Sequence, residues 1–145
     1  MALHLLKMCV GIDSIDHLRQ VQAARLARLR DAGEAARLCH WTRNMPRRGG
    51  EVTDGGSIYW IIKGHIRVRQ RILTIERVED APAPKNCALV LDQRLVETVP
   101  RRARPIQGWR YLAAADAPRD GRRVAADIDG MPDAMAEELR ELGLL

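Results

Sequence analysis

The stretch Tyr59–Ile72, YWIIKGHIRVRQRI, decides the predicted fold. Two apolar-rich runs flank a single glycine, which is the pattern of two antiparallel strands joined by a short turn. We therefore predict that residues 57–63 and 66–78 pair as a hairpin, with the turn near Lys63, Gly64 and His65. Every other element of the chain is placed relative to this hairpin.

The second strand of the hairpin carries an arginine at every second position: Arg67, Arg69 and Arg71. Residues two apart on a strand share one face at a spacing of about 6.6 Å, so the arginines are predicted to form a row. A two-residue turn would place Trp60 on that face, and a three-residue turn would place Tyr59 there. Arginine grips phosphates and stacks on bases, so the row is a candidate nucleic-acid surface. The alternative is a solvated face whose arginine stems shield an aromatic ring.

The opposite face of the same strand is apolar except at one position. Ile66, Val68 and Ile72 fall on this face, and Gln70 falls among them. A buried amide is destabilising unless it is hydrogen-bonded. Gln70 is therefore expected to need a polar partner inside the core.

The rest of the chain predicts an α+β fold. An apolar strand ending at Gly11 is followed by an amphipathic helix from Asp13 or Ser14 to Gly33, and then by several short strands. Consecutive antiparallel strands with one early helix favour a small mixed β-barrel. We predict one barrel domain over residues 1–115 and an acidic extension over 116–145 that ends in a helix.

The charge of the chain is uneven along its length. The net charge is +5, but residues 1–115 hold 20 Lys or Arg against 11 Asp or Glu, whereas residues 116–145 hold 4 against 8. A basic body attracts polyanions. The alternative is a coding bias, because 21 of the 24 basic residues are arginine. No apolar run is of membrane-spanning length, and three dispersed cysteines suit a reducing cytoplasm.

Candidate chemistry elsewhere in the sequence is sparse. Trp109 and Arg110 belong to a second basic and aromatic cluster, which supports the nucleic-acid interpretation. Cys39 and His40 are neighbours on a predicted strand, so their side chains point to opposite faces and do not form a nucleophile–base pair. The histidines and cysteines show no metal-ligand spacing. We predict no metal and no cofactor, and the sequence identifies no catalytic residue.

Three segments carry a resemblance to known proteins: ALHLLKMCVGIDS, GGSIYWIIKGHIRVRQRI and RPIQGWRYL. Together they resemble a family of short proteins of unknown function, chiefly from alphaproteobacteria. More remotely, the hairpin is similar to that of PUA-like domains, including the ASCH and EVE groups, which are small β-barrels that mostly bind RNA or modified nucleobases. Some ASCH proteins are amidohydrolases that use a Lys, a Thr and a Glu, and the matching residue types here are Lys63, Thr74 and Glu76.

The sequence thus predicts an RNA- or nucleotide-binding domain with a PUA-like fold. The alternatives are a small amidohydrolase-like enzyme that acts on a modified nucleoside, with Lys63 as the activating group, and a protein-interaction module built on the segment Trp109–Tyr111. A pocket that holds Lys63 and a carboxylate would favour the enzyme, and an open basic groove would favour the binder. The predicted nucleic-acid-binding residues are Arg67, Arg69, Arg71, Tyr59, Trp60, Lys63, Trp109 and Arg110.

Overall fold

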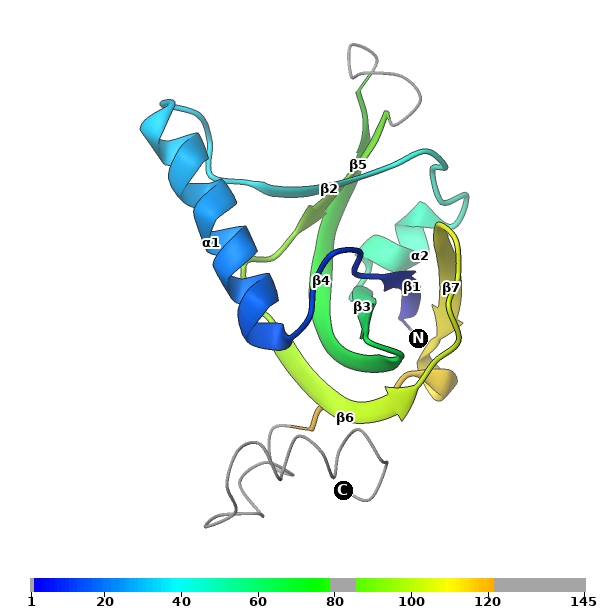
Figure 1. The fold of residues 1–145 in the computed structure, drawn as a ribbon. Coiled ribbons are helices and arrows are strands. Elements are labelled where there is room, and N and C mark those ends of the chain that lie inside the picture. The colour runs from blue at the N-terminus through cyan, green and yellow to red at the C-terminus, as the bar shows by residue number, and fades with distance from the viewer. Residues whose placement is uncertain (1, 79–85, 122–145) are drawn as a thin grey trace.

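The computed structural model describes residues 2–78 and 86–121, and its elements follow the predicted order closely (Figure 1). The predicted C-terminal helix lies outside the described residues, and the predicted boundary at residue 115 stays a prediction. In chain order the elements are β1 (Leu3–Met8), α1 (Ile15–Asp31), β2 (Leu38–Thr42), α2 (Gly49–Thr53), β3 (Ser57–Ile62), β4 (His65–Arg77), β5 (Cys87–Leu91), β6 (Val96–Arg102), β7 (Trp109–Ala113) and the 3-10 turn η1 (Ala114–Asp116).

The seven strands form one strongly bent sheet built around the long strand β4. The strand order is β2-β5-β4-β3-β1-β7, and β6 pairs separately with β4. The first half of β4 pairs with β3 and β6, while its second half pairs with β5. Only β1 and β3 run parallel among these pairs. The α+β class is confirmed, but within residues 2–78 and 86–121 the end strands β2 and β7 do not pair, so the sheet is not closed.

The predicted hairpin is confirmed as β3 and β4. The turn has two residues, Lys63 and Gly64, whose φ angles are 48° and 81°. Positive φ at both central positions is the requirement of a type I′ turn, which matches the twist of the flanking strands. Glycine adopts this conformation without strain.

A β-bulge at Arg67 changes which hairpin side chains share a face. Ile61 pairs with Ile66, but the next pair is Trp60 with Val68, so Arg67 is an extra residue on β4. The inserted residue reverses the side-chain parity beyond it. Tyr59 therefore lies opposite Arg69. The sequence predicted this pairing of Tyr59 with the arginine face only for a three-residue turn, whereas the turn has two residues.

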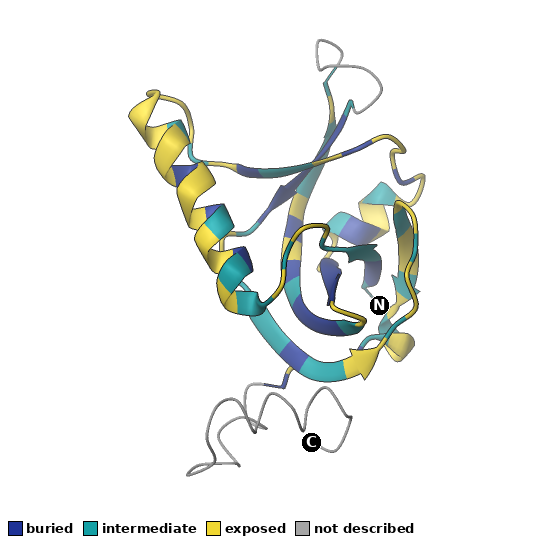
Figure 2. Cartoon of the chain, in the orientation of Figure 1, coloured by how far each residue is buried: buried dark blue, intermediate teal, exposed yellow. Residues whose placement is uncertain are grey.

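The bulge also divides the hairpin between two apolar cores. Trp60 and Val68 belong to the larger core, which α1 covers, whereas Tyr59, Ile61 and Ile66 form a smaller core on the other face. Figure 2 shows the buried residues concentrated along β3, β4 and β5. Each hairpin face is thus buried, and neither is the open surface that the arginine row requires.

The helix α1 begins and ends where the sequence predicts. The Ser14 hydroxyl accepts a hydrogen bond from the His17 N–H at 3.0 Å, which caps the first turn, and Gly33 follows the helix with φ 72°. Leu18, Gln22 and Leu26 are buried against the sheet. No helix in the described part of the chain is both long and apolar enough to cross a membrane.

The short helix α2 was not predicted. Its segment, GGEVT, begins with two glycines, which disfavour helix. The side chain of Val52 is completely buried in the larger core. Tertiary burial of one valine therefore outweighs the weak local helix propensity.

Candidate functional site

The three strand arginines do not form the open row predicted from their spacing. Arg67 is only 5% exposed, Arg69 is ion-paired, and Arg71 is exposed to solvent. The bulge is the physical reason, because it takes Arg67 out of the regular alternation of the strand. The binding role assigned to these three residues stays a prediction, and of the three only Arg71 is exposed.

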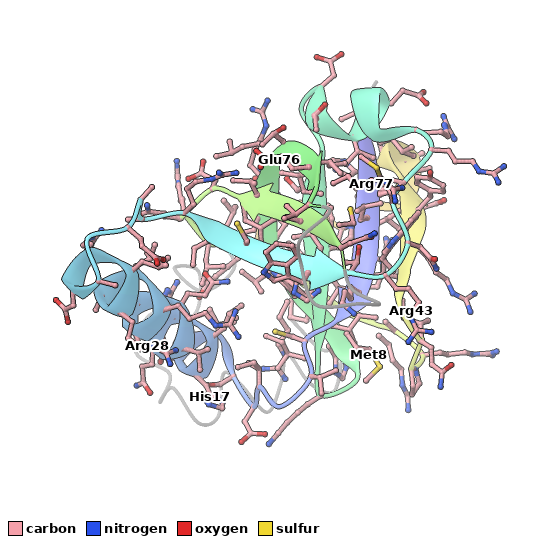
Figure 3. The ribbon with its side chains drawn as sticks, turned by 90° about the horizontal axis from the view of Figure 1, so that it is seen from above. Met8, His17, Arg28, Arg43, Glu76 and Arg77 are labelled. Atoms are coloured by element: carbon pink, nitrogen blue, oxygen red, sulfur yellow. The ribbon has the colours of Figure 1, made fainter. Side chains whose placement is uncertain are left out.

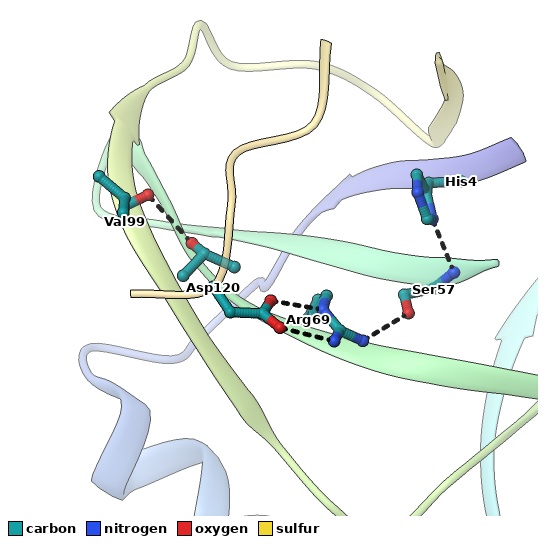
Figure 4. A network of polar contacts seen from close by, with 6 residues as sticks. His4, Ser57, Arg69, Val99 and Asp120 are labelled. Atoms are coloured by element: carbon teal, nitrogen blue, oxygen red, sulfur yellow. Dashed lines mark hydrogen bonds and ion pairs between the residues drawn. The ribbon is translucent and has the colours of Figure 1, made fainter. Parts of the chain in front are cut away.

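Arg69 lies at the centre of a polar network that joins three strands to the last described segment (Figure 4). Its Nε and Nη2 donate to the Asp120 carboxylate at 2.8 and 2.9 Å, and its Nη1 donates to the Ser57 hydroxyl at 3.1 Å. The Ser57 N–H in turn donates to Nδ1 of His4 at 3.0 Å. The network therefore anchors Asp120 beside the hairpin.

The network lowers the pKa values of two of its members, Asp120 and His4. The hydrogen bond from Arg69 holds the pKa of Asp120 below its ordinary value. Burial, together with the nearby Arg69 charge, lowers the pKa of His4, so that this imidazole is neutral and accepts a hydrogen bond at Nδ1. Residues 119–121 also pair with β6, through the Val99 N–H to the Arg119 carbonyl at 2.9 Å and the Gly121 N–H to the Glu97 carbonyl at 3.0 Å. These contacts are structural and leave Arg69 engaged within the protein.

Replacing Asp120 with asparagine is expected to lower the free energy of unfolding by about 1 kcal/mol at pH 7, because both partners are partly solvated. The folded-state pKa of Asp120 lies below its ordinary value of 3.8, so its contribution is present above that value and is lost as pH falls through the lower folded pKa. The difference between wild type and variant should therefore vanish in strong acid. Urea denaturation across pH checks this, with Arg71→Ala as a control that should change little.

The residues of the enzyme hypothesis are not brought together. Lys63 lies in the hairpin turn before β4 begins, whereas Thr74 and Glu76 lie near the far end of this 13-residue strand. Glu76 forms an ion pair with Arg37 at 2.7 Å. A hollow of about 680 Å³ does include Lys63, and it is lined also by Gly64, His65, Arg102, Ala103, Arg104 and Pro105. It contains no carboxylate among the described residues, so the condition set for the enzyme is not met.

A different hollow unites residues from distant parts of the sequence. It has a volume of about 450 Å³ and lies between the first half of α1, β2 and the end of β1. All three tryptophans of the chain line it, so we name it the tryptophan pocket. Its polar and aromatic lining consists of Lys7, Cys9, Gln22, Arg25, Cys39, His40, Trp41, Thr42, Arg43, Asn44, Trp60 and Trp109.

The floor of the tryptophan pocket is held by a buried amide pair. Gln22 and Gln70 exchange hydrogen bonds of 3.0 and 2.8 Å, and the Trp60 indole N–H donates to the Gln70 oxygen at 3.1 Å. The ring of His40 meets Trp60 edge-on, with centroids 5.1 Å apart. The partner expected for Gln70 is thus found, and it fixes the orientation of the indole at the base of the pocket.

The rim of the pocket is exposed and basic. Trp41 is 38% exposed, and Arg25 and Arg43 are also exposed. Among the described residues that line the pocket there are three side chains with a permanent positive charge, Lys7, Arg25 and Arg43, and no Asp or Glu. Cations that converge on a concave apolar site favour an anionic ligand.

The loop that carries Arg43 is fixed by contacts with β7. The Trp109 indole N–H donates to the Asn44 carbonyl at 2.8 Å, and the Tyr111 hydroxyl accepts the Arg48 N–H at 3.1 Å. The rings of Trp109 and Tyr111 pack edge to face at 4.9 Å. Trp109 and Tyr111, which belong to the segment proposed as a protein-interaction module, therefore support one wall of the pocket.

The pocket thiols do not have the properties of nucleophiles. Burial raises the pKa of Cys9 to about 11 even though Arg25 and Lys7 oppose the shift, and burial also raises the pKa of Cys39. Reactive cysteines instead have a lowered pKa. No group of three or more His, Cys, Asp or Glu within residues 2–78 and 86–121 could hold a metal ion. The two thiols that line the pocket therefore lack the lowered pKa of a reactive cysteine.

Two of the predicted site residues, Trp60 and Trp109, line the tryptophan pocket, and the others do not. Arg110 is exposed next to Trp109 on β7, where neighbouring side chains point to opposite faces. The predicted site residues did not include Lys7, Arg25, Trp41 and Arg43, which also line the pocket. The position of Arg43 two residues after Trp41 is a basic and aromatic pairing of the kind that supported the nucleic-acid interpretation.

The chain matches one family model over residues 5–145, and the family is described as Protein of unknown function (DUF1489). The chain belongs to this family. Comparison with curated proteins and with solved structures finds no match for this DUF1489 chain. The resemblance seen in the sequence to a family of unknown function is confirmed, and the function must be argued from the site itself.

Proposed function

We propose that this chain binds RNA or a nucleotide, and that a base occupies the tryptophan pocket. The observation that carries the proposal is the lining: three tryptophans and three permanent cations around a hollow with no described carboxylate. A volume of about 450 Å³ lies within the range of about 300–1,000 Å³ for small-ligand sites. Indole rings bind flat bases by stacking, and the exposed side chains of Arg25 and Arg43 bind phosphate.

The proposed nucleic-acid-binding site is therefore the tryptophan pocket and not the arginine face of β4. Arg67 and Arg69 are engaged within the fold, whereas no described residue bonds to the side chains of Arg25 and Arg43. The PUA-like relationship belongs to the same proposal. It is supported by a bent, mostly antiparallel sheet with one helix directly after the first strand.

The test is fluorescence anisotropy of a fluorescein-labelled hexauridylate at several salt concentrations. Trp41→Ala is expected to weaken binding by about 1–3 kcal/mol with little change in the salt slope, because stacking releases no counterions. Arg43→Ala is expected to flatten the slope of log affinity against log salt by about 0.7, which corresponds to one phosphate contact. Both changed residues are exposed at the rim, so the fold is expected to persist.

Arg71→Ala is the matched control, because Arg71 is an exposed arginine of β4 that lies outside the pocket lining. It should bind like the wild type. Absence of binding at low salt would overturn the proposal. If Arg71→Ala weakened oligonucleotide binding as much as Arg43→Ala, the nucleic-acid-binding surface would instead lie on the exposed side of β4.

A further inference from the structure

A second hollow adjoins the tryptophan pocket along β2. It has a volume of about 470 Å³ and lies between the second half of α1 and the beginning of β2. Four residues line both hollows: Arg25, Leu38, Cys39 and Trp41. The two hollows therefore share one wall, which includes the exposed Trp41, and we name the two together the groove.

The second hollow adds basic charge in line with the first. Arg25 and Arg28 are three residues apart on α1, so their side chains are neighbours on one helix face. Neither side chain bonds to a described residue, and both are exposed. Glu34 and Arg37 also line the hollow, and Arg37 is paired with Glu76. Arg25 and Arg28 are thus the cations available to a ligand in this hollow.

The length of the groove exceeds that of one nucleotide. The tryptophan pocket is lined by every residue of β2 and by Arg43 and Asn44, and the second hollow extends the lining to Arg37 and to Arg28 on α1. Five strand residues cover about 13 Å, whereas a stacked strand advances about 3.4 Å per nucleotide. Figure 3 shows Arg28 on α1 and Arg43 beyond the opposite end of β2. A ligand that contacts both must extend along the whole strand.

We propose that the ligand is a single strand of nucleic acid, with one nucleotide in the tryptophan pocket and its neighbour in the second hollow. This inference rests on the proposed function and specifies its substrate class. The exposed Trp41 ring stacks a base at the junction, Arg43 contacts the phosphate beside the pocket, and Arg25 and Arg28 bind the backbone along α1. A free mononucleotide occupies only one of the two hollows.

The experiment measures displacement of fluorescein-labelled hexauridylate by unlabelled uridine mono-, di-, tri- and hexanucleotides. Affinity should rise about 5- to 140-fold from the mononucleotide to the dinucleotide or trinucleotide, which is the fold-change that corresponds to one added stacked base. It should then change little with further length. Arg28→Ala should reduce the affinity for the longer ligands several-fold and leave mononucleotide affinity unchanged.

Arg30→Ala is the matched control for Arg28→Ala, since Arg30 is an exposed arginine of α1 that lines neither hollow. Alanine is a good helix former at positions 28 and 30 alike.

Equal affinity for mononucleotide and oligonucleotide would overturn this inference and leave the proposed function standing. A steady rise with length that is equally sensitive to Arg30→Ala would show non-specific attraction and would also overturn it. Displacement by an acidic peptide at the same charge concentration would point to a protein ligand and reject the single strand. Absence of binding by every nucleotide would overturn both proposals.

Discussion

Replacing Gln70 with leucine is expected to lower the free energy of unfolding by about 3–5 kcal/mol. Gln70 is completely buried, and its amide bonds Gln22 in both directions, the Trp60 indole N–H and the Asp92 carbonyl. Leucine has a similar size, so little cavity forms, but the partners of Gln70 lose their hydrogen bonds. Each buried polar group left unsatisfied costs about 1–3 kcal/mol. Gln22 and Trp60 are buried, whereas Asp92 is partly exposed, so water can satisfy its carbonyl.

Urea denaturation followed by circular dichroism measures this loss, with an unchanged m-value expected. The companion variant is the double change Gln22→Leu with Gln70→Leu. Because the two amides are each other's partners, the double variant should lose less stability than the sum of the two single variants. A loss below about 1 kcal/mol for Gln70→Leu would show that the amide network contributes little, since even one unsatisfied group costs that much.

The importance of Gln70 follows from the sequence, but the identity of its partners does not. A single amide in the apolar alternation of β4 already indicates a buried polar contact. Gln22 falls on the apolar stripe of α1, 48 residues away, and only the packing of helix on sheet brings the two side chains together. The sequence of β4 thus predicts that Gln70 has a buried polar partner, and only the tertiary structure identifies that partner as Gln22.

The arginine row shows where a local pattern misleads. The alternation on β4 is regular in the sequence, and no residue type marks Arg67 as the site of a bulge. Bulges arise from the pairing of whole strands, since here both β3 and β6 shift register at this position. One inserted residue was enough to bury Arg67 and to place Tyr59, rather than Trp60, opposite Arg69.

The tryptophan pocket could be predicted only in part. Its aromatic and basic residue types were identified as a nucleic-acid signature, and two of its tryptophans were named. Its walls, however, come from six parts of the chain: residues 7–12, 18–25, 38–44 and 108–109, together with Trp60 and Leu91. The pairings of β1 with β3 and β7, the pairing of β2 with β5 and the packing of α1 on the larger core bring these segments together. Such long-range pairings leave no periodic signal in a single sequence.

Replacing Gly56 with alanine is expected to lower the free energy of unfolding by about 3 kcal/mol, because overpacking against rigid neighbours costs up to about that amount. A Cβ atom at this position would lie closer than 3.0 Å to the carbonyl oxygens of Leu3 and Val52, which are backbone atoms of β1 and α2. A flexible side chain could turn away, but here a strand and a helix would have to separate.

The same displacement would weaken the hydrogen bonds around Gly56. Its N–H donates to the Val52 carbonyl at 2.8 Å, and its carbonyl accepts the Ile72 N–H at 3.0 Å. The next residue, Ser57, donates its N–H to His4 and accepts from Arg69, so the polar network behind the hairpin would shift as well. The loss should therefore appear in global unfolding and not as a local change.

Gly50→Ala is the matched control for Gly56→Ala. Gly50 lies in α2, and a Cβ atom there would meet nothing within 4 Å. Because alanine favours helix by about 1 kcal/mol over glycine, Gly50→Ala should be as stable as wild type or slightly more stable. Thermal and urea denaturation of the two variants side by side provides the measurement. If Gly56→Ala were as stable as wild type, α2 would have to move away from β1 at no cost in free energy. The complete burial of Val52, a residue of α2, in the larger core argues against such movement.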